Sequence, residues 1–135
     1  MTHAARPSHA PAQALTHSPL EHWQRVGLGI RLAYNPAKAD VLRYWLAHGV
    51  RLTERRLIDE VGMLKRCLRL LMQTAHDEAL PWYWRSVCLE HTAGPLARLT
   101  TLLRLHDPLE GEALHAFVQA AHERLAAAAD APGRR

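Results

Sequence analysis

Apolar residues recur every three or four positions through the middle of the chain, from Thr53 to Ala79. This spacing places them on one face of an α-helix, and no proline interrupts the run. Thr53 can cap the start of such a helix, and Glu54 stands where the helix dipole favours an anion. The pattern therefore predicts one long central helix. Its apolar face consists of Leu57, Ile58, Val61, Leu64, Leu68, Leu71, Met72, Ala75 and Ala79.

Shorter helices are predicted on both sides of this run. Three begin at a capping residue followed by proline, which fits the first helical turn because its missing N–H is not needed there. A fourth opens at Gly94-Pro95, and Gly49 is expected to end the second as a left-handed terminator. The three starts are Ser18-Pro19, Asn35-Pro36 and Asp107-Pro108, for helices over 19–34, 36–48 and 108–129. The last should turn Leu109, Leu114, Phe117, Val118, Ala121 and Leu125 inward.

A strand is the alternative interpretation of residues 26–34, because Val26, Leu28, Ile30, Leu32 and Tyr34 also alternate. The cap at Ser18 favours the helix, and the sequence has no second convincing strand to pair with this one. The sequence thus predicts an all-α, single-domain bundle of five or six helices around the long central helix. Short connections predict antiparallel neighbours.

Composition divides the chain of 135 residues into three parts. Residues 1–17 are predicted to be a disordered tail, residues 18–129 the helical bundle, and residues 130–135 a second disordered tail. Two cysteines, Cys67 and Cys88, are too few for a disulfide framework and indicate buried thiols in a reducing compartment. With no signal peptide and no membrane-spanning run in the sequence, we expect a cytoplasmic protein.

The net charge of +4 is unevenly distributed. Residues 1–70 carry 11 Lys/Arg and 5 Asp/Glu, a net charge of +6, whereas residues 71–135 carry 6 and 8, a net charge of −2. Such polarity can steer an anionic partner to one side of the molecule, or one copy toward another. The candidate nucleic-acid or anion-binding residues are Arg51, Arg55, Lys65, Arg66 and Arg69.

A helix-turn-helix is one way to use these cations. Gly62 would be the turn glycine, and Lys65, Arg66 and Arg69 would face the groove and phosphates of DNA. Ile58 is bulky where the two helices should touch, and no Ser or Thr opens the second helix. An uninterrupted helix, with the same cations on its outer face, is the competing interpretation.

A second apolar flank leads to the first functional hypothesis. Met63, Cys67 and Leu70 lie beside the main apolar face, and a helix with two apolar flanks usually packs on more than one neighbour. We interpret these three residues as an interaction surface. The first hypothesis is a non-enzymatic interaction module: an adaptor, a chaperone-like protein or an oligomeric bundle that binds a protein partner or itself.

Candidate ligand chemistry is sparse. Trp82 and Trp84 could wall a ligand pocket, although tryptophans in a small helical protein are usually core residues. Metal or haem binding by His76, His91 and His122 is the third hypothesis, but no metal-ligand spacing supports it. The sequence contains no phosphate-binding glycine loop and no nucleophile motif. We therefore expect no enzymatic activity and assign no cofactor.

Overall fold

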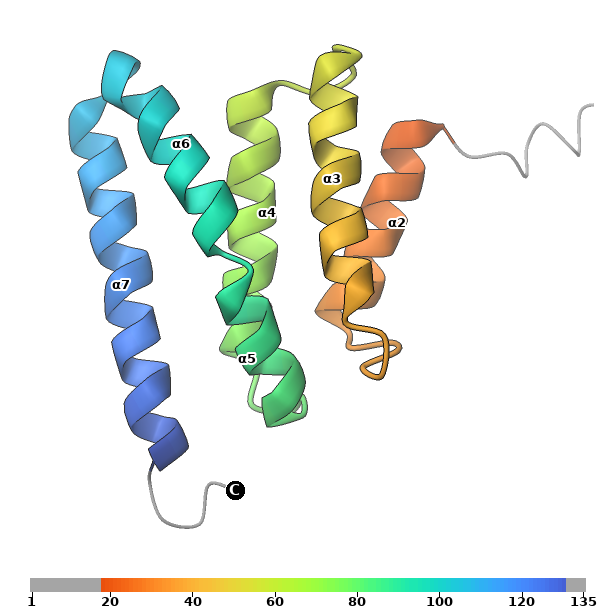
Figure 1. Cartoon of the computed structure of the whole chain (residues 1–135), viewed down its shortest axis with the longest axis vertical. Helices are drawn as coiled ribbons and strands as arrows, with labels where there is room; N and C mark the ends of the chain where they lie inside the picture. The colour runs from red at the N-terminus through yellow and green to blue at the C-terminus, as the bar shows by residue number, and fades with distance from the viewer. Residues whose placement is uncertain (1–17, 131–135) are drawn as a thin grey trace, which may run out of the picture.

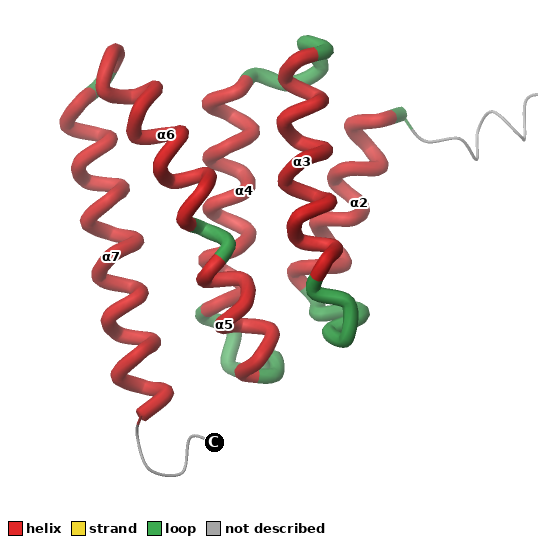
Figure 2. Tube along the Cα trace, in the orientation of Figure 1, coloured by secondary structure: helices red, strands yellow, loops and turns green. Residues whose placement is uncertain are grey.

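The computed structural model describes residues 18–130, and every regular element in that range is an α-helix. Short turns join the helices (Figure 2). α2, α3 and α4 alternate in direction, and α7 returns antiparallel to α6 (Figure 1). The predicted all-α single domain is confirmed. Of the two predicted tails, 1–17 lies outside the described residues, and 130–135 does so except for Asp130, which is the last residue of α7 and not part of a tail. The helices are α2 (Pro19–Arg31), α3 (Asp40–Glu54), α4 (Glu60–Ala75), α5 (Trp82–Glu90), α6 (Ala93–His106) and α7 (Pro108–Asp130).

α4 is the central element, as the sequence predicts, and it packs on α2, α3, α5 and α6. Half of its circumference is buried, which explains why apolar residues occupy so many of its positions. α7 lies at the edge of the bundle and packs mainly along α6 (Figure 1). The buried residues of α4 are Met63, Leu64, Cys67, Leu68, Leu71, Met72, Thr74 and Ala75.

The predicted continuous helix from Thr53 to Ala79 is wrong, because the chain turns between α3 and α4. Arg56 has a φ of 60°, and the N–H of Leu57 donates to the carbonyl of Leu52 at 2.9 Å. These features are a Schellman ending of α3 in which an arginine takes the left-handed position usually held by glycine. α4 then starts at its own cap, where the Asp59 carboxylate accepts the N–H of Gly62 at 2.9 Å.

The helix predicted over 36–48 is displaced, and Gly49 does not end it. α3 starts at Asp40 and continues through Gly49, which is buried. A Cβ at Gly49 would lie 3.0 Å from Met63 Sδ and 3.1 Å from Trp23 Nε1. Gly49 is therefore needed for the close approach of α2 and α4 to α3, and its place in the sequence carried no information on the helix end.

The cap-and-proline starts of α2 and α7 are confirmed. Ser18 Oγ accepts the N–H of Glu21 at 3.1 Å, and Glu21 Oε1 accepts the N–H of Ser18 at 3.0 Å. Asp107 Oδ1 accepts the N–H of Glu110 at 3.1 Å. The predicted inward face of the last helix is wrong at Leu109 and Phe117, which are 77% and 56% exposed.

Candidate functional site

An apolar groove is lined by residues of α3, α4 and α6 and of the turn between α3 and α4. α4 lies between α3 and α6 (Figure 1), and its residues form the floor of the groove. The volume of the groove is about 1180 Å³. The floor runs from Glu60 to Cys67, about 10 Å along the axis of α4 at about 1.5 Å per residue. We call it the α3–α6 groove. Its apolar lining is Leu46, Ala47, Val50, Leu57, Ile58, Met63, Leu64, Cys67 and Pro95.

The groove exposes apolar side chains to solvent. Val50 on α3 is 47% exposed, and Leu57 in the α3–α4 turn is 43% exposed. The Schellman ending of α3 places Leu57 at this edge, while Met63 and Leu64 beneath it belong to the buried core. The lining is thus continuous with the core. A contiguous apolar surface of this kind on a small domain is typical of a binding site.

Charges of both signs surround the groove. Arg98 on α6 forms two hydrogen bonds with the Glu60 carboxylate on α4, at 2.8 and 3.3 Å. Glu54 and Arg56 line the opposite edge, and neither takes part in an ion pair within residues 18–130. Asp59, which caps α4, also lines the groove outside any of these ion pairs, so a partner would meet two carboxylates and one guanidinium that are not neutralised by an ion pair among the described residues.

The five cations predicted as one anion-binding set do not form one surface. Arg51 and Arg55 lie at the end of α3, whereas Arg66 and Arg69 are exposed on the side of α4 that faces away from the groove floor. Lys65 forms an ion pair with Glu110 of α7 at 2.7 Å.

The helix-turn-helix interpretation is also wrong. Gly62 lies in the first turn of α4, and the break in the chain comes earlier, at Arg55–Asp59. α3 and α4 lie antiparallel beside each other (Figure 1). The second of two such helices does not project from the first as a recognition helix does.

The predicted interaction surface lies largely inside the molecule. Met63 and Cys67 are buried, and the thiol of Cys67 lies 3.6 Å from Met63 Sδ. Leu70 is half-buried against the core. Burial raises the pKa of both Cys67 and Cys88 to about 12, so that neither forms a reactive thiolate near neutral pH.

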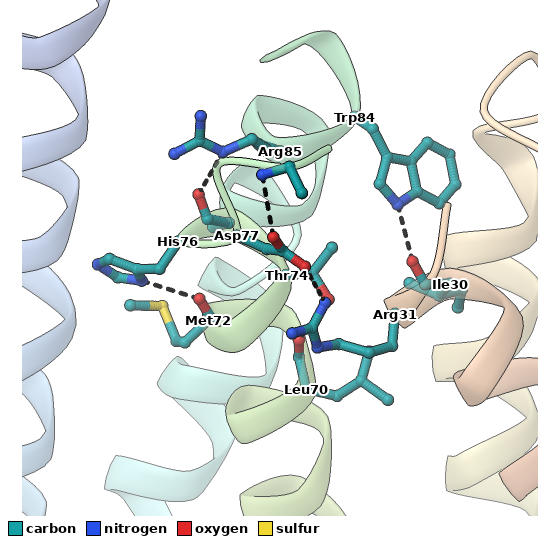
Figure 3. Close-up of polar contacts among 11 residues, drawn as sticks. Ile30, Arg31, Leu70, Met72, Thr74, His76, Asp77, Trp84 and Arg85 are labelled. Atoms are coloured by element: carbon teal, nitrogen blue, oxygen red, sulfur yellow. Dashed lines mark hydrogen bonds and ion pairs between the residues drawn. The ribbon is translucent and has the colours of Figure 1, made fainter. Parts of the chain in front are cut away.

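The two tryptophans predicted to wall a pocket have separate surroundings. Trp84 is buried, and its indole N–H donates to the carbonyl of Ile30 on α2 at 2.8 Å (Figure 3). Trp82 is half-buried, with the guanidinium of Arg85 5.0 Å from its ring centre. A small cleft of about 290 Å³ includes Trp84 and not Trp82. The hydrogen bond of Trp84 thus joins α5 to the end of α2.

The three histidines of the metal hypothesis are distributed singly. His76 Nδ1 lies 2.8 Å from the carbonyl of Met72 (Figure 3), and His91 Nδ1 lies 2.9 Å from the carbonyl of Val87. His122 Nε2 contacts the Thr92 hydroxyl at 3.2 Å. No three His, Cys, Asp or Glu residues within 18–130 are grouped so that they could hold a metal ion.

A cluster of rings that sequence reasoning missed lies between α2 and α3. His22 Nε2 lies 3.1 Å from the Tyr44 hydroxyl, and the His22 and His48 rings are 5.5 Å apart between centres. Tyr44 and His48 are one turn apart on α3, a spacing visible in the sequence. Their proximity to His22 depends on the pairing of the two helices, which the spacing does not give.

Comparison of the chain with protein-family models, with curated proteins and with solved structures found no match. Over residues 18–130, none of the helices has the length and apolar content needed to traverse a lipid bilayer.

Proposed function

We propose that this protein is a non-enzymatic interaction module that binds an amphipathic helix of a partner protein in the α3–α6 groove. One observation carries the proposal: an apolar groove flanked by two helices and floored by a third, with Val50 and Leu57 exposed at its edges. Recognition of a helix by such a groove is a recurring mode of peptide binding.

The dimensions of the groove favour a helix as its occupant. The contact positions i to i+7 of a helix span about 10 Å along its axis, which matches the length of the α4 floor from Glu60 to Cys67. The occupant would present apolar residues at positions i, i+3, i+4 and i+7 to this floor. A cation on one of its flanks could pair with Glu54 and an anion with Arg56, which would fix its orientation.

The location that agrees with this proposal is the cytoplasm. Cys67 and Cys88 are both buried as free thiols. A reducing compartment maintains such thiols without further protection.

A labelled peptide of about 18 residues tests the proposal, with leucines at helical spacing and lysines and glutamates elsewhere. We expect fluorescence anisotropy to show micromolar binding that weakens about tenfold or more in Val50→Asp, because a buried carboxylate would lack a partner. Leu105→Asp is the matched control. Leu105 is 79% exposed on α6 and lies outside the groove, so binding should be unchanged.

Three results would count against the proposal. Absence of peptide binding would remove its basis, and equal weakening in both variants would show that binding does not use the groove. Native mass spectrometry adds a third measurement. A dimer that Val50→Asp dissociates would make a second copy of the chain the occupant and exclude a separate partner protein.

A further inference from the structure

A row of basic side chains follows one flank of α3, away from the α3–α6 groove. Tyr44, His48, Arg51 and Arg55 are spaced four, three and four residues apart. At about 100° per residue, these positions remain within an arc of about 60° over three turns. We call His48, Arg51 and Arg55 the basic row, and Tyr44 stands at its start.

α2 adds a further group to the row. The His22 ring lies 5.5 Å from that of His48 and 6.3 Å from that of Tyr44, between ring centres. The Tyr44 and His48 rings are 5.8 Å apart. Side chains from two helices therefore converge at one end of the row, and the two arginines extend from it along α3.

The positive charge of the row is not neutralised within the described structure. Arg51 and Arg55 are exposed and belong to none of the ion pairs found in residues 18–130. Burial lowers the pKa of His48, and the charges of Arg51, His22 and Arg55 lower it further. The groups that act on His48 from both helices are thus cationic or neutral, with no carboxylate among them.

His48 also has an unmet hydrogen-bonding requirement. Its Nδ1 atom is buried and has no hydrogen-bond partner. An anion close to the row would favour the protonated imidazole, because a nearby negative charge stabilises the charged form. It would at the same time compensate the charges of both arginines.

We infer that the basic row binds the phosphodiester backbone of a nucleic acid. Arg51 and Arg55 are the principal phosphate contacts. Tyr44 can donate a further hydrogen bond at the end near α2, and a protonated His48 would add to the positive charge of the row. Contacts of this type position a protein on nucleic acid without reading its sequence. The inference is independent of the α3–α6 groove, since Val50 and Leu57 take no part in it.

The experiment measures binding of the full chain to a fluorescent DNA duplex of about 20 base pairs over a range of salt concentrations. Arg51→Gln/Arg55→Gln should weaken binding about tenfold or more at low salt. Because each phosphate contact contributes about 0.9 to the slope of log K against log salt, the slope should fall by about two. Both side chains are exposed, so the double variant should retain the helical circular dichroism of the wild type.

Arg66→Gln/Arg69→Gln is the matched control, because it removes the same charge from the outer side of α4. Its affinity should stay within about twofold of the wild type, apart from a small general effect of net charge. His48→Gln provides a second readout. Because the pKa of His48 is lowered in the free protein and raised by a bound anion, wild-type binding should strengthen as the pH falls from about 8 to about 5. This variant should match the wild type at the higher pH and show a smaller gain at the lower pH.

Several outcomes would overturn the inference. Wild-type protein that fails to bind the duplex at low salt would do so, as would equal losses in the α3 and α4 double variants. Tighter binding to vesicles containing an anionic phospholipid than to DNA, with the same dependence on Arg51 and Arg55, would assign the row to a membrane surface instead.

Discussion

Trp23 and Trp45 each donate the indole N–H to the backbone carbonyl of the other, at 2.9 and 3.0 Å. Their rings stack with centres 5.2 Å apart and an angle of 11° between planes. A glycine follows each tryptophan by four residues, Gly27 on α2 and Gly49 on α3, and each glycine lies against the indole of the opposite helix. Each helix thus packs the indole of its tryptophan against the glycine of the other helix.

The reciprocal pair should make a large contribution to stability. Trp45→Phe removes one buried hydrogen bond and part of a close-packed ring, and we expect a loss of about 2 kcal/mol in the free energy of unfolding measured with urea. Trp82→Phe is the control, since Trp82 is only half-buried, and should cost under about 1 kcal/mol. Equal losses would show that the pairing itself adds little.

Two glycines in α2 should respond to alanine with opposite signs. A Cβ at Gly27 would lie 3.0 Å from the Trp45 indole, so Gly27→Ala should destabilise the protein by about 1–3 kcal/mol. A Cβ at Gly29 would approach nothing closer than 3.8 Å, so Gly29→Ala should gain about 0.5–1 kcal/mol from helix propensity. Thermal unfolding of both variants tests the difference. Stabilisation by Gly27→Ala would contradict the close packing of α2 on α3.

The positions of these glycines explain which parts of the fold the sequence predicts. Capping residues act locally, so the sequence correctly predicts the starts of α2 at Ser18 and of α7 at Asp107. Glycine often ends a helix, so the local sequence predicts a terminator at Gly49. Its actual role depends on a tryptophan 26 residues earlier in the sequence, which no local pattern reveals.

The break between α3 and α4 was missed for a related reason. Leu57, Ile58 and Val61 continue the three-and-four spacing across the turn, and no glycine or proline marks it. The α3–α6 groove could not be predicted either, because its lining comes from three helices and the turn between two of them. The sequence shows where the basic residues are but not how they group, since the turn separates Arg51 and Arg55 from the cations of α4.

At the ends of two helices, a residue other than glycine adopts the left-handed backbone conformation. Ala33 after α2 has a φ of 51°, and Arg56 after α3 has a φ of 60°. This backbone conformation is strained for residues with a Cβ, and glycine would relieve the strain. Glycine also has greater conformational entropy in the unfolded chain, which offsets part of the gain. We therefore expect Ala33→Gly to raise the free energy of unfolding by about 0.5–1 kcal/mol. Ala116→Gly, within α7, should instead lower it by about 1 kcal/mol. A loss of stability in both variants would contradict the assigned helix ending.

An ion pair between Arg31 and Asp77 joins the end of α2 to the turn after α4, with Nη1 and Oδ2 2.7 Å apart (Figure 3). Asp77 Oδ1 also accepts the N–H of Ala79 at 3.0 Å. The hydrogen bond from Arg31, followed by that from Ala79, lowers the pKa of Asp77 below its ordinary value. The carboxylate therefore contributes stability above the pKa of the unfolded chain, about 3.9, and loses it as the pH falls toward the lower folded value.

Asp77→Asn should consequently be less stable than the wild type at neutral pH, and the difference should shrink as the pH falls below about 4, where the wild type loses the same interaction. Urea denaturation at a series of pH values measures this convergence. Asp40→Asn is the control, because Asp40 pairs with Arg43 within one exposed helical turn and such pairs contribute little. A difference between Asp77→Asn and the wild type that persists unchanged into acid would mean that the loss comes from packing and not from the charge.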